Sequence, residues 1–344
     1  MGRLTKLDGT MALPLWHRLG CAKATTVNIR DNVHVKGNVY GGSELGRVTD
    51  SITVNISGNV IVGRNAAGSY GHGNVYGGGM GHTLTDVEVG QISNADTKDS
   101  IPTFAGLTGG TIKVNISGGA INNNVYGAGE LASVGTIATV TKHTDKATTY
   151  FLSWPYEYTY NGNSGDARVN ITGGTIGYIS AGNDTTGGNI YGSARGTVGD
   201  RYVTGRLATA RVTHVDINLT NPGDKIIGDV YGSGENGHVY DSAVVTLRNG
   251  LVLGNVFGGG KGVDKYTDQL KDPTDDHLYD AEVYDIIAGK VFGNTKVNIL
   301  GGRVAKAFKF ISSFSLFFNK LSFIFSSEFI SSSLSFLLHW HPIF

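Results

Sequence analysis

The sequence predicts an all-β fold, a parallel β-helix (β-solenoid) with loop insertions, and three observations favour it. The 344 residues include 52 Gly, well above the usual share of about 7%. One strand-like pattern recurs seven times along the chain. The distance between copies varies, but the additional residues enter at only two points of the pattern. A stack of similar turns, with loops leaving at fixed points, explains all three observations.

Each copy opens with β-branched residues in which apolar and polar side chains alternate. In Val27, Asn28 and Ile29, the period of two places the first and third side chains on one face of a strand. The seven openings begin at Thr26, Thr53, Lys113, Arg168, His214, Val244 and Lys296. Because equivalent residues stack in such a fold, we expect an internal row of valines. Its members are Val27, Val54, Val114, Val169 and Val215.

The first six copies close with an aromatic residue followed by glycine. The closing aromatics are Tyr40, Tyr76, Tyr126, Tyr191, Tyr231 and Phe257. Two positions before each lies a residue expected to bond neighbouring backbone amides; these residues are Asn38, Asn74, Asn124, Asn189, Asp229 and Asn255. A Gly- or Asn-rich corner and a short apolar pair separate opening from closing. Each copy therefore predicts three short strands, divided by residues that accept left-handed backbone angles.

The spacing of the copies distinguishes a solenoid from a β-propeller. The shortest copy advances only 26 residues, from Tyr231 to Phe257, whereas a propeller blade needs four strands in about 40 residues. Loops are expected after the apolar pair and after the closing glycines; their ranges are 63–72 and 177–187, then about 83–110, 131–167, 197–211 and 263–295. The predicted organisation is an irregular lead (1–24), a solenoid of six complete turns and a truncated seventh (25–305), and an atypical low-complexity tail (306–344).

A family resemblance adds to this interpretation. The units "VNISGG" and "NVYGGG", with "GGAI" at Gly118 to Ile121, resemble the repeats of glycine-rich, right-handed β-helical surface proteins of Gram-negative bacteria, which are adhesin-like or autotransporter-passenger-like. The resemblance covers about Thr25 to Val304. It implies a right-handed β-helix in an exported protein at the outer cell surface or outside the cell, with glycans or host and cell-surface components as partners.

Two functions follow from these observations. The first is a non-catalytic structural or adhesive segment of a larger bacterial protein, in which the stacked turns are a rigid spacer and the loops are contact surfaces. The second is a carbohydrate-active β-helix enzyme, similar to polysaccharide lyases or glycoside hydrolases. Its site would lie on loops such as 131–167 or 263–295.

Composition excludes several other classes. The 28 basic and 28 acidic residues balance, so no net charge attracts nucleic acid or an anionic membrane. A single cysteine, Cys21, excludes an internal disulfide framework. The glycine strings do not match a nucleotide site, because neither "GxxxxGK[ST]" nor one "GxGxxG" between a strand and a helix occurs. We expect no cofactor.

The closing aromatics are the candidate ligand contacts. Adjacent residues of a strand face opposite ways, so if the residue before each aromatic fills the core, the aromatic rings form a row on the outside. Sugar rings would stack on such a row. The alternative is that the rings stack on one another and that loops cover the remainder. The run "WPYEYTY" from Trp154 to Tyr160 is a second aromatic surface or a covering hairpin.

Charged residues form weaker candidates. Three positions after the first closing glycine lie Glu44, Met80, Glu130, Arg195, Glu235 and Lys261; they indicate either a catalytic carboxylate pair or a solvated ladder in which Glu235 lies between Arg195 and Lys261. The last insertion contains Asp272, Asp275, Asp276, His277 and Asp280, which are either calcium ligands or a solvated acidic loop. His72 and His82 flank one closing strand, but two histidines without further ligands are weak grounds for a metal site.

The two ends depart from the pattern. Residues 307–344 contain ten of the 14 Phe and no Gly, which indicates either a membrane anchor or a seventh copy interrupted by a change of reading frame or truncation. The stretch Leu321 to Leu338 is nearly long enough to span a membrane but contains Glu328 and many serines. The apolar run Met11 to Trp16 is too short for a signal peptide. We therefore expect the chain to be an internal fragment.

Overall fold

The computed structural model describes nine segments of the chain. They are residues 20–63, 72–82, 105–142, 156–179, 185–197, 208–262, 265–271, 278–284 and 288–305. All of them belong to one compact unit, residues 1–306. The regular elements of the described residues are strands without exception, so no helix of membrane-spanning length and hydropathy occurs among them. Most of the predicted lead and the predicted tail (306–344) lie outside these segments.

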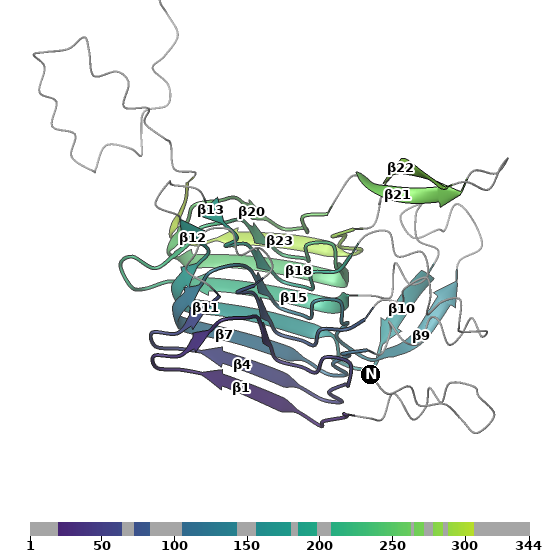
Figure 1. The fold of residues 1–344 in the computed structure, drawn as a ribbon, viewed down its shortest axis with the longest axis horizontal. Helices are drawn as coiled ribbons and strands as arrows, with labels where there is room; N and C mark the ends of the chain where they lie inside the picture. Colours follow the sequence, from purple (N-terminus) through teal and green to yellow (C-terminus); the bar gives the residue numbers. More distant parts are fainter. Residues whose placement is uncertain are drawn as a thin grey trace, which may run out of the picture. The chain divides into compact units, whose positions relative to one another are not determined.

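The opening strands form one long parallel sheet in which chain order equals spatial order (Figure 1). The strands are β1 (Thr25–Ile29), β4 (Ile52–Ile56), β7 (Ile112–Ile121), β11 (Asp166–Ile176), β15 (Thr209–Asn218), β18 (His238–Asn249) and β23 (Asn294–Ile299). Thr26 pairs with Thr53, Thr53 with Lys113, and so on through Val244 with Lys296. The predicted alignment of the seven openings is thereby confirmed.

Two further parallel ladders complete each turn, which we call a rung. The apolar pairs form β2 (His34–Val35), β5 (Ile61–Val62), the ends of β7 and β11, β16 (Lys225–Ile226), β19 (Leu251–Val252) and β24 (Arg303–Val304). The closing aromatics lie in β3 (Val39–Tyr40), β6 (Val75–Tyr76), β8 (Val125–Tyr126), β14 (Ile190–Tyr191), β17 (Val230–Tyr231) and β20 (Val256–Phe257). An all-β fold of parallel ladders, consistent with a β-solenoid, is therefore present.

A fourth contact between rungs was not predicted. Between the closing glycines and the next opening strand, single-residue parallel bridges join Ala22, Val48, Thr108 and Val134 in succession. Val239 and Val291 form the equivalent bridge near the other end. One bridging residue is too short to produce the alternating pattern by which the longer strands are recognised.

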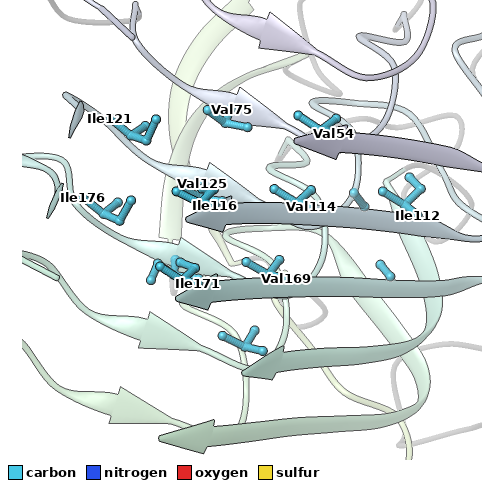
Figure 2. Packing of buried hydrophobic residues seen from close by; sticks show 14 of the residues in the cluster. Val54, Val75, Ile112, Val114, Ile116, Ile121, Val125, Val169, Ile171 and Ile176 are labelled. Atoms are coloured by element: carbon cyan, nitrogen blue, oxygen red, sulfur yellow. The ribbon is translucent and has the colours of Figure 1, made fainter. Parts of the chain in front are cut away.

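The core lies between the ladders and consists of stacked aliphatic side chains. Val54, Val114 and Val169 are completely buried and lie one above another on successive opening strands (Figure 2). Val75 and Val125 of the closing strands are equally buried and contribute to the same cluster. The predicted valine row is thus internal, and Val27 is half-buried because it belongs to the first rung.

Glycine has two different structural roles in the rungs. A left-handed angle recurs between the opening residues and the apolar pair, as predicted, at Gly58 (φ 78°), Gly119 (φ 89°) and Gly174 (φ 95°). At Gly119 and Gly174, however, β7 and β11 continue through this position, where the sequence predicted two separate strands. The glycine after each aromatic has no such angle. A Cβ on Gly127 would instead lie 2.2 Å from the carbonyl oxygen of Gly192 on the next rung. That glycine is required because two backbones approach closely there.

Three of the expected insertions contain β-hairpins in place of irregular loops. The antiparallel pairs are β9 (Ile137–Lys142) with β10 (Tyr156–Tyr160), β12 (Tyr178–Ile179) with β13 (Thr185–Thr186), and β21 (Lys265–Lys271) with β22 (Leu278–Tyr284). The described part of "WPYEYTY" is β10, so that run forms one strand of a hairpin. Alternating β-branched and aromatic residues favour strands in these segments.

Candidate functional site

The closing aromatics form one continuous stack along the solenoid. Tyr40, Tyr76 and Tyr126 have ring centroids 4.8 Å apart at each step, with ring planes 13° and 14° from parallel. The steps from Tyr126 through Tyr191 and Tyr231 to Phe257 measure 4.9 to 5.0 Å. This spacing equals the separation of hydrogen-bonded strands, so backbone pairing itself sets the rings at stacking distance. Each pair of rings contributes about 0.5–1.5 kcal/mol beyond burial.

Burial differs along this aromatic ladder. Tyr76, Tyr126 and Tyr191 are 2% exposed or less, and Tyr231 is 8% exposed. These four form a buried cluster separate from the aliphatic core, with Tyr40 packed against it. Phe257 is 42% exposed at the other end. The four central rings therefore show the stacking arrangement that the sequence left as the alternative, and ring surface for a sugar is available only at Phe257 and the half-buried Tyr40.

A row of side-chain acceptors runs beside the aromatic ladder. Oδ1 of Asn38 accepts the backbone N–H of Asn74 at 3.0 Å, and Oδ1 of Asn74 accepts that of Asn124 at 3.1 Å. The same bond repeats at the next three rungs at 2.7 to 3.0 Å. The accepting side-chain oxygens belong to Asn124, Asn189 and Asp229, and the donating backbone N–H groups belong to Asn189, Asp229 and Asn255, respectively. The predicted role of this position is confirmed. This particular bond uses only the acceptor oxygen, so Asp229 also makes it.

Two glutamates accept hydrogen bonds from phenols of this ladder. The Tyr126 hydroxyl donates to Oε2 of Glu235 at 2.7 Å, and the Tyr40 hydroxyl donates to Oε2 of Glu130. Glu130 and Glu235 lie on the corner that follows the closing strands, two rungs beyond the tyrosine that each one binds. Their side chains are only 14% and 19% exposed. The sequence interpretation did not connect these carboxylates with the aromatic ladder.

The same corner carries two ion pairs. Arg195 contacts Oε1 of Glu130, and Nζ of Lys261 lies 2.8 Å from Oε1 of Glu235. Glu235 lies between Arg195 and Lys261 along the stack, as predicted, but Arg195 pairs with Glu130. The basic side chains are about half exposed, at 49% and 48%, so each pair is worth about 0–1 kcal/mol. Glu44 and Met80, at the start of the same row, are exposed.

The surroundings of the phenols hold them in the protonated form. Burial raises the pKa of Tyr76, Tyr126 and Tyr191 well above the ordinary value, and the negative charges of Glu130 and Glu235 raise it further. The pKa of Tyr40 and of Tyr231 is raised in the same way, first by burial. A phenol in this state donates a hydrogen bond but does not act as a base at neutral pH. The ladder is therefore suited to packing.

A second polar cluster lies on the outer face of the long sheet. Asp166 accepts from Arg168 Nη2 at 2.8 Å, and its Oδ1 is 3.7 Å from Nε2 of His214 on the neighbouring strand. Burial, followed by the positive charge of Arg168, lowers the pKa of His214 against the opposing effect of Asp166. The alignment already contained this signal, because Arg168 and His214 occupy the same repeat position and Asp166 precedes Arg168 by two.

The remaining candidates do not form a site in the described residues. Asp272, Asp275, Asp276 and His277 lie outside those residues, and Asp280 is within β22. His72 is exposed, and His82 is half-buried. Within the described segments, no group of three or more His, Cys, Asp or Glu side chains is arranged to hold a metal ion.

Comparison with known proteins places the chain in no group. No protein family, curated protein or solved structure matches it. The functional argument therefore depends on the geometry described above.

Proposed function

We propose that this chain is a non-catalytic structural and adhesive segment of a larger exported bacterial surface protein. The observation that carries the proposal is the unbroken register of the aromatic ladder from Tyr40 to Phe257 across insertions of very different length. Such a stack makes a rigid rod, because each rung is hydrogen-bonded to both neighbours. Insertions that leave it without disturbing the register are free to vary as contact surfaces.

The chemistry of the corner supports the non-catalytic alternative. Both glutamates that approach the aromatic ladder are engaged twice, each by a phenol and by a basic side chain. A catalytic acid or base needs a carboxyl oxygen within hydrogen-bond reach of the substrate group to which it gives, or from which it takes, a proton. The half-buried ion pairs leave Glu130 and Glu235 as acceptors that hold phenols in place.

A binding experiment on the full chain tests the adhesive function. The protein is immobilised and exposed to a panel of neutral and acidic polysaccharides and to host extracellular matrix. In a matched variant, residues 143–155 are replaced by Gly and Ser. We expect binding by the natural chain, and loss or weakening in the variant with the β-type circular dichroism spectrum retained. Absence of binding to every member of the panel would contradict an adhesive role.

A carbohydrate-active enzyme is the second candidate, favoured by the cluster of Asp166, Arg168 and His214 on one face of the sheet. β-Elimination in a uronate-containing polysaccharide needs a base, an acid and a cation that neutralises the uronate carboxylate. Incubation with the same polysaccharides, followed by assay of reducing ends and of unsaturated products by ultraviolet absorbance, tests this function. Turnover that disappears in Asp166→Asn or His214→Gln would replace the adhesive proposal with the enzymatic one.

A further inference from the structure

Five of the six rings in the aromatic ladder are phenols, which lose one electron far more easily than the benzene ring of Phe257. The five are Tyr40, Tyr76, Tyr126, Tyr191 and Tyr231. Neighbouring rings among them have centroids 4.8 to 5.0 Å apart and planes within 8° to 14° of parallel. Rings stacked in this way are in contact through their π faces, so an electron has only a short distance to cross at each step.

The stack keeps its central rings away from solution. Tyr76, Tyr126 and Tyr191 are 2% exposed or less, and they belong to a cluster separate from the aliphatic core. A phenoxyl radical on a buried ring cannot couple with a second molecule or react by contact with a dissolved reductant. Transfer to the neighbouring ring is therefore the open route for the electron.

Every second phenol of the stack donates a hydrogen bond to a carboxylate. The pairs are Tyr40 with Glu130, Tyr126 with Glu235 at 2.7 Å, and Tyr231 with Asp229 at 3.1 Å. Among the described residues, no carboxylate accepts a hydrogen bond from Tyr76 or Tyr191. An oxidised phenol is a strong acid, so a carboxylate that already accepts its hydrogen bond takes the proton when the electron leaves. A radical is thus stabilised at alternate rings, and the rings between them are bridges.

We propose that the aromatic ladder conducts one-electron oxidation along the solenoid. The radical rests at Tyr40, Tyr126 and Tyr231, and the electron crosses the rings of Tyr76 and Tyr191 between them. The oxidant is a one-electron acceptor from solution, such as a peroxyl radical, which becomes a hydroperoxide anion. This activity is additional to the structural and adhesive function and does not depend on it, because it needs only the stack and its carboxylates.

The electrons and protons balance at each step. The oxidant first takes an electron from Tyr40, and the phenol proton passes to Glu130. An electron then moves from Tyr126, across the ring of Tyr76, to the Tyr40 radical. Glu130 returns its proton to Tyr40, and the Tyr126 proton passes to Glu235. Each advance of two rungs therefore exchanges one phenoxyl radical and one carboxylic acid for the same pair further along, with no atom gained or lost.

Site-directed photo-oxidation of the full chain tests this conduction. A ruthenium polypyridyl photosensitiser is attached at Glu44→Cys, four residues after Tyr40, in a Cys21→Ser background that removes the single natural thiol. At Tyr231, 3-aminotyrosine replaces the natural residue and traps the radical, because an aminophenol is oxidised more easily than a phenol. A light flash with a cobalt(III) ammine as electron acceptor generates the ruthenium(III) oxidant. We expect electron paramagnetic resonance to detect the aminotyrosyl radical.

Two variants interrupt the path in different ways. Tyr126→Phe keeps a stacked ring but removes the oxidisable phenol, and Glu235→Gln keeps every phenol but removes the proton acceptor. In each, the yield of the trapped radical should fall below half of that in the intact ladder. Tyr178→Phe, a half-buried tyrosine of β12 outside the ladder, is the matched control and should leave the yield unchanged. Circular dichroism establishes that each variant is folded.

Three outcomes would overturn the proposal. Absence of the trapped radical, when the photosensitiser is oxidised, means that the stack does not conduct. A yield in Tyr126→Phe and Glu235→Gln equal to that of the intact ladder means that the electron takes another path. The photosensitiser and the trap are also placed on separate molecules and mixed; an equal yield in this mixture means that the transfer occurs between molecules and not along the ladder.

Discussion

The Tyr126 hydroxyl donates a hydrogen bond of 2.7 Å to Glu235, a residue 109 positions later in the chain and two rungs further along the solenoid. Tyr40 and Glu130 repeat this relationship two rungs earlier. The bond therefore links the buried aromatic ladder to the charged corner over a longer axial distance than any backbone ladder bond. It also gives Oε2 of Glu235 a hydrogen-bond donor, whereas Lys261 pairs with Oε1.

Removal of the Tyr126 hydroxyl should destabilise the protein. In Tyr126→Phe, Glu235 loses a phenol donor in a largely buried position, and we expect a loss of about 1–3 kcal/mol in the free energy of unfolding. Tyr126→Ala also removes a fully buried ring from the stack and should cost about 3–5 kcal/mol. Chemical denaturation followed by circular dichroism measures both. Tyr191→Phe is the control, because no glutamate of the described residues accepts a hydrogen bond from that buried hydroxyl; an equal loss in both Phe variants would contradict the role of Glu235.

Alanine at the glycine after an aromatic should disturb the stacking of rungs. The new Cβ of Gly127→Ala would lie 2.2 Å from the backbone carbonyl oxygen of Gly192 and 3.0 Å from Cγ2 of the Val169 side chain. We expect a destabilisation of about 1–3 kcal/mol from overpacking. Gly37→Ala should change stability by less than about 0.5 kcal/mol, since no atom lies within 4 Å of its added Cβ. Thermal and chemical unfolding distinguish the two, and similar values would show that rung spacing is not the constraint.

The acceptor row beside the aromatic ladder should tolerate aspartate but not alanine. Oδ1 of Asn189 accepts the Asp229 backbone N–H at 2.9 Å, so Asn189→Ala leaves that donor unpaired at a cost of about 1–3 kcal/mol. Asn189→Asp keeps the oxygen, as Asp229 does for Asn255 at 2.7 Å. Denaturation midpoints should therefore show a loss in the alanine variant at least twice that in the aspartate variant. The reverse order would mean that the amide nitrogen carries the stabilisation.

The rung alignment was predictable because burial imposes a period of two on every opening strand. Thr26 to Lys296 pair in the expected order, and the closing aromatics do the same. Position within a copy determines which ladder a residue joins, and this information is local in the sequence. Patterns of this kind survive insertions, since the loops leave the rung without altering its register.

Contacts along the stack were harder to predict. The bond between Tyr126 and Glu235 depends on how far a side chain reaches across two rungs. No sequence pattern near either residue indicates this contact. Burial of the aromatic ladder likewise depends on ring-on-ring packing. The period of two correctly predicts that Val125 and Tyr126 face opposite ways and belong to two different clusters. It does not predict that both clusters are buried. Single-residue bridges such as Val48 with Thr108 are too short to leave a periodic signal.

His214 should make stability depend on pH in a defined direction. Burial and the positive charge of Arg168 lower its folded-state pKa, although Asp166 opposes them, while the unfolded value is about 6.5. The unfolded chain then binds the proton more readily. The stability linked to His214 is therefore greatest above pH about 6.5, falls as the pH drops below it, and stops falling once the pH passes the lowered folded-state value.

The difference between the natural chain and His214→Gln isolates this effect from other titrating groups. Denaturant unfolding at pH 8, 6.5 and 5 should show the natural chain losing more stability than the variant toward pH 5. Nuclear magnetic resonance titration of the His214 ring provides the direct value, expected below 6.5 and higher in Arg168→Gln, where one of the two lowering causes is gone. A folded-state pKa above 6.5 would mean that Asp166, 3.7 Å away, dominates the site, and the pH dependence would then reverse its sign.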